Sequence, residues 1–195
     1  MKLLHIVIFY AISTCTLFAQ NSKEIIQKFL NEHYLEQGLT KMDLKNWAIT
    51  SQHTSKQSGA TYVYIQQTHQ GIAVANGVAN FALKDGKVFS MGNGFIDHLD
   101  QKATSTIPSL EPSLAIQKAA AQLNINNSID IQLVEKINSN HFVYNTANIS
   151  LEKIPVELMY FNEKNGSIKL VWDLSIYTLD AEHWWSVKID AHTGN

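Results

Sequence analysis

Apolar and polar residues alternate along the stretch from Ala60 to Ile96, around which the rest of the chain is organised. β-branched and aromatic residues fill Thr61–Gln67, and the pattern resumes over Ile72–Leu83 after a break at Gly71. Such alternation is typical of strands with one buried face. Asp85-Gly86 is a sequence that favours a tight hairpin turn. We therefore expect successive antiparallel strands joined by turns.

A helical pattern precedes this meander. Over Asn21–Gln37 the apolar residues recur every three or four positions and form one stripe, made of Ile25, Ile26, Phe29, Leu30 and Tyr34. Asn21 is suited to cap the first turn, and Gly38 is suited to end the helix. We expect the stripe to lie on the meander, with a short connection or strand over Asp43–Thr50 and a polar loop over Gln52–Gly59 between them.

The second half of the chain repeats the order of helix and strands. Pro112 suits the first turn of a helix that we expect to continue to about Leu123, packed on a sheet through Leu114, Ala115, Ala119 and Leu123. The strands expected after it are Phe142–Tyr144, Ile154–Phe161, Lys169–Thr178 and a last one in which Trp185, Val187 and Ile189 alternate. Asn165-Gly166 and Asp180–His183 are expected to form turns between them.

Two such units in succession predict an α+β fold, in which each unit has one helix on one face of an antiparallel sheet. The stretch 98–108 is rich in Thr, Ser and Asp, lacks apolar periodicity and ends in a proline, which is typical of a linker. The predicted boundaries are therefore 20–97 for the first unit, 98–108 for the linker and 109–195 for the second unit.

The first 19 residues differ in kind from the rest. Lys2 is their only charge, an apolar run from Leu3 to Ile12 follows, and Ala19 is a small residue at a position suited to cleavage. This pattern indicates a secretory signal peptide at 1–19. A buried N-terminal helix and a lipoprotein acylated at Cys15 are the alternatives. Because Cys15 is the only cysteine, the mature chain, secreted or held in a bacterial cell envelope, would have no disulfide and no thiolate ligand.

Charge and composition narrow the classes of function. The 195 residues carry 15 basic and 17 acidic side chains, for a net charge of −2, and 45% of the residues are hydrophobic. Such a balance offers no positively charged footprint for nucleic acid or for an anionic membrane. We expect a globular chain that binds neither.

The segment Tyr62–Val74, YVYIQQTHQGIAV, is followed by a strand, a glycine turn and another strand, and it resembles the fungalysin/thermolysin propeptide (FTP) module. The second half resembles the PepSY module that follows it in fungalysin-type pro-regions, through a helix that begins at Pro112 and through LVWDLSIYTL and WWSVKIDAHTG. The positions that carry the two resemblances are Gln66, Gly71, Ile72, Val74, Trp172, Asp190, Ala191 and Gly194.

This resemblance implies a function. It implies a non-catalytic pro-region of a secreted zinc metallopeptidase, which acts as an intramolecular chaperone and as an inhibitor of the peptidase domain, in cis or in trans. It also implies that the zinc belongs to that peptidase domain and that this chain needs no cofactor. The alternative is a stand-alone secreted inhibitor or an envelope binding module of the same fold.

The residues themselves offer no catalytic set. A zinc peptidase most simply places two histidines at i and i+4 on a helix with a glutamate between them, and none of the eight histidines here has that spacing. Glu182-His183 and His192 flank the last predicted hairpin and are the nearest approach to a metal or acid–base cluster, but we favour the interpretation that they are polar turn residues. The sequence therefore predicts no catalytic residue and no metal ligand.

Aromatic residues are the remaining candidates for a partner surface, because interfaces are enriched in them. Trp172 and Trp185 lie on the alternating apolar faces of their predicted strands, so we expect both in the core. Trp184 falls on the opposite face from Trp185 and is the candidate interface residue.

Overall fold

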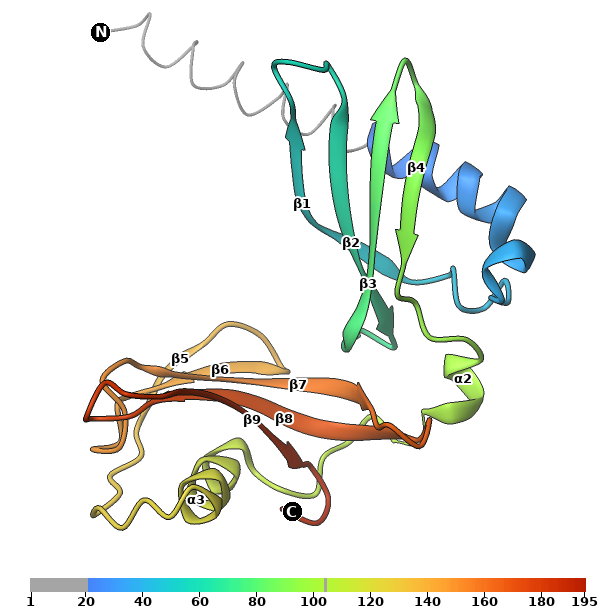
Figure 1. Ribbon diagram of the computed structural model, residues 1–195. Coiled ribbons are helices and arrows are strands. Elements are labelled where there is room, and N and C mark those ends of the chain that lie inside the picture. Colours follow the sequence, from blue (N-terminus) through green and yellow to red (C-terminus); the bar gives the residue numbers. More distant parts are fainter. Residues whose placement is uncertain (1–20, 104) are drawn as a thin grey trace, which may run out of the picture. The chain divides into compact units, whose positions relative to one another are not determined.

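The computed structural model describes residues 21–103 and 105–195, so the predicted signal peptide lies outside the described residues. The described chain divides into two compact units (Figure 1). Unit 1 holds residues 21–69 and 76–100, and unit 2 holds residues 70–75 together with the described residues from 101 to 195. Each unit has helix and antiparallel sheet, which confirms the predicted α+β class.

Unit 1 begins with the predicted helix. Residues 21–33 are α-helical, and a 3-10 turn, η1 (Tyr34–Gln37), follows. Gly38 ends the helix in the left-handed region, with φ of 70°, as predicted. The first described residue, Asn21, is already helical and so does not precede the helix as its cap.

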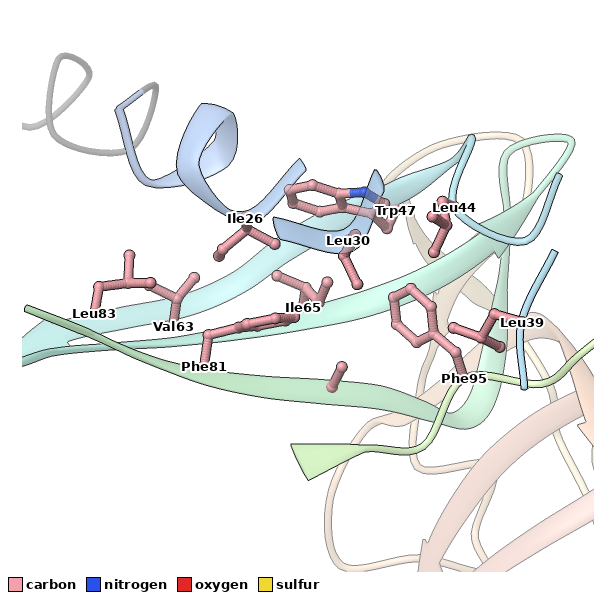
Figure 2. Close-up of a cluster of buried hydrophobic side chains, with 11 residues drawn as sticks. Ile26, Leu30, Leu39, Leu44, Trp47, Val63, Ile65, Phe81, Leu83 and Phe95 are labelled. Atoms are coloured by element: carbon pink, nitrogen blue, oxygen red, sulfur yellow. The ribbon is translucent and has the colours of Figure 1, made fainter. Parts of the chain in front are cut away.

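The sheet of unit 1 has the order β1-β2-β3-β4. Its strands are β1 (Trp47–Thr54), β2 (Thr61–His69), β3 (Ile72–Lys84) and β4 (Lys87–Asn93). Figure 2 shows the core of unit 1 between the helix and this sheet, where Ile26 and Leu30 meet Val63, Ile65 and Phe81. The predicted packing of the apolar stripe on the meander is confirmed.

β1 extends to Thr54, so the loop predicted over Gln52–Gly59 is wrong in its first half. A β-bulge lies between Ile49 and Ser51, where the register with β2 shifts. Before the bulge Ile49 pairs with Ile65 on the core side, and after it Gln52 pairs with the buried Val63. Residues 51–54, SQHT, are all polar, so no apolar alternation marks this end of β1.

Tight turns connect the later strands of the meander. Gln70 and Gly71 have φ of 50° and 80°, and Asp85 and Gly86 have φ of 51° and 73°. Two successive positive φ values define a type I′ turn, which matches the twist of a hairpin. The hairpin turn predicted at Asp85-Gly86 is confirmed.

β3 contributes to both units. Ala79–Lys84 pairs with β4 in unit 1, whereas Ala73–Ala75 pairs in parallel with residues 159–161 of β7 in unit 2. The predicted first unit, 20–97, kept these residues together. The structure divides them because the backbone of residues 73–75 finds its hydrogen-bonding partner in β7.

Unit 2 has five antiparallel strands in sequential order and one long helix. The strands are β5 (Leu133–Lys136), β6 (His141–Tyr144), β7 (Ile154–Asn162), β8 (Ile168–Tyr177) and β9 (Trp184–Asp190). The helix is α3 (Pro112–Gln122), which contacts β8 and β9. Its buried face holds Ala115, Ile116, Ala119 and Ala120, so Leu114, which is 42% exposed, was predicted on the wrong side.

The stretch predicted as a linker begins with structure of its own. A short helix, α2 (Leu99–Lys102), lies where the chain passes from unit 1 to unit 2, and Leu99 is buried. Among the described residues, no helix combines the length and apolar character needed to cross a membrane.

Candidate partner-binding surface

The turn at Gly71 places two family-motif residues in a core. Its φ of 80° lies in the left-handed region, which favours glycine. Ile72 and Val74 follow on β3 and are both buried, and Val74 lies opposite the buried Tyr160 of β7. These three motif positions therefore shape a turn and fill the core of unit 2.

The two adjacent glutamines of the motif segment, Gln66 and Gln67, face opposite sides of β2. Gln66 is partly exposed and donates to the carbonyl of Gly77 at 3.4 Å. Gln67 is fully buried, and its side chain forms a reciprocal pair with Ile96: Nε2 donates to the carbonyl oxygen and Oε1 accepts from the N–H, each at 2.9 Å. A shift of one residue along a strand reverses the face, so only Gln67 points inward.

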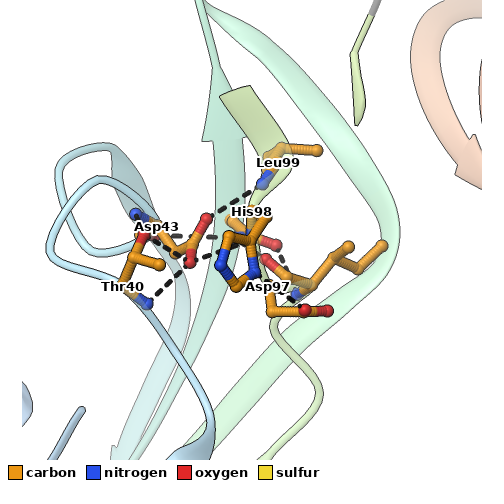
Figure 3. A network of polar contacts seen from close by, with 7 residues as sticks. Thr40, Asp43, Asp97, His98 and Leu99 are labelled. Atoms are coloured by element: carbon orange, nitrogen blue, oxygen red, sulfur yellow. Dashed lines mark hydrogen bonds and ion pairs between the residues drawn. The ribbon is translucent and has the colours of Figure 1, made fainter. Parts of the chain in front are cut away.

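Asp43 completes this buried network and was not singled out from the sequence (Figure 3). Asp43 is 3% exposed, and its carboxylate accepts four hydrogen bonds. Two come from Thr40, through N–H and Oγ1 at 2.8 Å each, and the His98 and Leu99 N–H groups donate one each at 3.1 and 3.0 Å. The Asp43 carbonyl also accepts from Gln67 Nε2 at 3.5 Å. The network therefore fastens residues 96–99 to the loop before β1. The sequence offers no signal for this network, because the His98 and Leu99 donors lie 55 and 56 residues from Asp43 along the chain.

Trp172 is buried, as predicted, and it holds the segment before α3. The indole Nε1 donates to the carbonyl of Leu110 at 2.8 Å, and the ring meets Phe142 edge to face with centroids 6.0 Å apart. The hydroxyl of Tyr160 donates to the carbonyl of Ser105 at 2.9 Å in the same segment. Both buried aromatic rings thus bond to the backbone of residues 105–110.

The closing turn holds that segment from the other side. The carbonyl of the buried Ala191 accepts from the N–H groups of Ser109 and Leu110, each at 2.9 Å. The Asp190 carboxylate accepts from the N–H groups of His192 and Thr193, also at 2.9 Å, and Gly194 closes the turn with φ of 77°. Burial alone would raise the pKa of Asp190, but the hydrogen bonds from Thr193 and His192 outweigh it and lower the pKa.

The residues considered for metal or acid–base chemistry are not brought together. Glu182-His183 and His192 lie beyond opposite ends of β9, and His192 Nδ1 lies 3.1 Å from Ser109 Oγ. His183 does gather with Glu182 and Asp180, but all three are exposed and together offer only one imidazole. The Asp180 carboxylate already accepts bonds from Thr178 Oγ1 and Glu182 N–H, so local turn geometry accounts for this cluster.

The two adjacent tryptophans of β9 are both exposed. Trp184 is 67% exposed, and its ring stacks on Tyr177, the residue opposite it on β8. Trp185 faces the same side as the buried Ile176, yet it stacks on His183 and remains 41% exposed, so its predicted place in the core is wrong. The alternation along β9 was correct, but the core on that face covers Ile176 of β8 and not Trp185 beside it on β9, which pairs with β8 alone.

A comparison with known families finds a match in the first half of the chain. Residues 45–95 match the family named Fungalysin/Thermolysin Propeptide Motif. The match spans the four strands of the meander and includes the turn at Gln70-Gly71. The resemblance to a propeptide of fungalysin-type metallopeptidases is thereby confirmed.

Curated proteins similar to this chain include extracellular metalloproteinases. The chain is similar to Extracellular metalloproteinase 10 of Coccidioides posadasii (strain C735), 26% identical over 144 residues, and to Extracellular metalloproteinase 9 of Uncinocarpus reesii (strain UAMH 1704), 28% identical over 148 residues. Each alignment covers 73% of this chain and 23% of the relative. The chain therefore spans about a quarter of the length of the curated relatives it matches.

One solved structure is similar over most of the chain. The chain is similar to the Bacillus megaterium YpeB C-terminal domain, with a TM-score of 0.39 and 13% sequence identity. The superposition covers 90% of this chain and 61% of the YpeB chain. A likeness at that distance carries no argument about function.

Proposed function

We propose that this chain is the non-catalytic pro-region of a secreted fungalysin-type zinc metallopeptidase, and that it assists folding of the peptidase domain and then inhibits it. The observation that carries the proposal is the match of residues 45–95 to the propeptide family. The similarity to extracellular metalloproteinases over 73% of the chain supports it. The described surface contains exposed aromatic residues, which suit a binding role.

The zinc of this proposal belongs to the partner. A catalytic zinc site needs three protein ligands, usually including at least one histidine, held in a shielded pocket. The group of Asp180, Glu182 and His183 is fully exposed, and its aspartate is occupied by a turn. These residues do not fit such a site, so no step of the function passes through zinc bound to this chain.

Inhibition by a pro-region follows from mass action. An inhibitor joined to its enzyme experiences a high effective concentration, so modest contacts keep the cleft closed while the two remain linked. Removal of the link lowers that concentration and releases the enzyme. Assistance in folding has the same origin, because a chain that binds the native peptidase and not the unfolded one shifts the equilibrium towards the native form.

Refolding tests the chaperone half of the proposal. The mature metallopeptidase encoded in the same gene or operon is unfolded in denaturant and diluted with and without an equimolar amount of this chain. Because the chain is also expected to inhibit the refolded enzyme, activity is assayed in both samples after the chain has been digested, and we expect the active fraction to be at least about tenfold higher in the sample refolded with the chain. A secreted metallopeptidase of an unrelated family, treated identically, serves as the control and should gain nothing. Equal recovery of the cognate peptidase with and without the chain contradicts the chaperone role.

A further inference from the structure

One end of the unit 2 sheet carries an exposed apolar surface. It lies where β8 ends and β9 begins, and we call it the aromatic end; it consists of Leu179, of Tyr177 and Trp184 on one face of the sheet, and of Trp185 on the opposite face at the same end. Leu179 is 49% exposed, and the tryptophans are 67% and 41% exposed. Large apolar side chains gathered on a surface mark interaction sites more often than isolated ones do.

The aromatic end is held in one conformation. Trp184 stacks on Tyr177 with centroids 5.2 Å apart and planes at 12°, and Trp185 stacks on His183 at 5.1 Å and 7°. Thr178 fastens the connecting loop, because its N–H donates to the carbonyl of His183 at 2.9 Å and its hydroxyl accepts from the His183 N–H at 3.1 Å. A surface ordered in advance loses little conformational entropy when a partner binds.

The charge beside these rings is negative. From Thr178 to Trp185 the sequence has two carboxylates, Asp180 and Glu182, and no lysine or arginine. The hydrogen bond from the Thr178 hydroxyl, followed by that from the Glu182 N–H, lowers the pKa of Asp180. The neighbouring loop, whose Leu151 N–H donates to the Tyr177 carbonyl, adds Glu152 and Lys153, which offset each other.

We propose that the aromatic end is the docking surface through which this chain holds the peptidase domain. The complementary surface on the peptidase domain is an apolar hollow that binds the Trp184 ring. Lysine or arginine residues of the peptidase domain border this hollow and face Asp180 and Glu182. This inference rests on the proposed function and adds the surface and the chemistry of its partner. A membrane suits the surface less well, because the carboxylates repel anionic lipid headgroups.

Direct binding to the purified mature peptidase tests the docking surface, with inhibition recorded in parallel. Trp184→Ala should weaken binding at least about 30-fold, because a desolvated aromatic anchor carries much of the energy of an interface. Phe89→Ala is the matched control: Phe89 is 60% exposed on β4 of unit 1 and should change the affinity less than about threefold. Equal effects of the two variants, or none from Trp184→Ala, would overturn the inference.

A second variant tests the charge independently of any ring. Glu182→Lys should weaken binding about tenfold at low salt and less at 0.5 M salt, because screening weakens interactions between exposed charges. Glu135→Lys on the exposed strand β5 is the matched control and should leave binding unchanged. Tighter binding by the Glu182→Lys variant would overturn the predicted basic border.

The outcomes separate this inference from the proposed function. Binding that is sensitive to Trp184→Ala but produces no inhibition supports the docking surface and refutes the inhibitory role. Inhibition that is insensitive to Trp184→Ala and Glu182→Lys supports the inhibitory role and refutes the docking surface. Absence of binding by the unmutated chain refutes both. Flotation of the chain with zwitterionic lipid vesicles, abolished by Trp184→Ala, would instead assign the aromatic end to a membrane and overturn the inference.

Discussion

Replacement of Asp43 by alanine should destabilise unit 1 more than any exposed substitution near it. The change removes the acceptor of four hydrogen bonds at a site that is 3% exposed. Each hydrogen bond to a charged group contributes about 1.5–3 kcal/mol, and a buried donor left without a partner costs about 1–3 kcal/mol. Water and local relaxation recover part of this loss, so we expect about 3–5 kcal/mol in the free energy of unfolding of unit 1.

The assay follows each unit separately, because two units need not unfold together. Unfolding in denaturant is monitored by hydrogen exchange of separate peptides. The peptides of unit 1 should show the lower free energy of unfolding, and those of unit 2 should change little. The amides of His98 and Leu99 donate to the Asp43 carboxylate. Their exchange rates should increase more over those of the unmutated chain than the rates of other amides do.

Two companion variants make this prediction specific. Asp43→Asn retains one acceptor oxygen but presents an amide donor to N–H groups, so its cost should be about 2–3 kcal/mol. Asp100→Ala, at an exposed position one residue beyond the network, should cost less than about 0.5 kcal/mol. If Asp43→Ala is as stable as Asp100→Ala, the network does not hold residues 96–99 and the reasoning is refuted.

Three further predictions concern unit 2. Trp172→Phe keeps an aromatic ring but leaves the Leu110 carbonyl without its donor, so it should cost about 1–3 kcal/mol and speed exchange of the amides before α3. Gly71→Ala meets no neighbouring atom within 4 Å but must adopt φ of 80°, so it should cost about 1 kcal/mol in thermal unfolding. The lowered pKa of Asp190 stabilises the closing turn above about pH 4, and this contribution should fade as the pH falls through the folded-state pKa; Asp190→Asn should remove that pH dependence.

Each of these has a clear contrary result. Unchanged exchange before α3 in Trp172→Phe would mean that other contacts hold the segment. A gain in stability from Gly71→Ala would mean that the turn relaxes freely to negative φ. An acid profile of the Asp190→Asn variant identical to that of the unmutated chain would assign the loss of stability to other carboxylates.

Hydrophobic alternation predicted the parts of the fold that local patterns determine. Ile26 and Leu30 recur at helical spacing, and Leu170 to Ile176 alternate at strand spacing, so the helix of unit 1 and the strand β8 followed directly. Gly38 and Gly86 marked an end and a turn because each requires positive φ. The same alternation along β8 correctly predicted that Trp172 lies in the core.

The remaining features depend on contacts that are distant in sequence. The parallel pairing of Ala73–Ala75 with β7 joins segments more than 80 residues apart, and no local pattern encodes it. The bulge near Ile49 and the inward face of Gln67 depend on the register with the neighbouring strand. Trp185 was placed in the core because alternation reports the face of a strand but not where the core beneath it ends.

The inhibitory half of the proposed function is tested most directly by titration of the native mature peptidase with the separately purified chain. The initial rate of peptide hydrolysis is measured as the chain is added at fixed enzyme concentration, in the presence of excess zinc. We predict that the rate falls to near zero at one chain per enzyme and recovers after the chain is digested. A rate that stays unchanged at a hundredfold excess of folded chain would contradict the account.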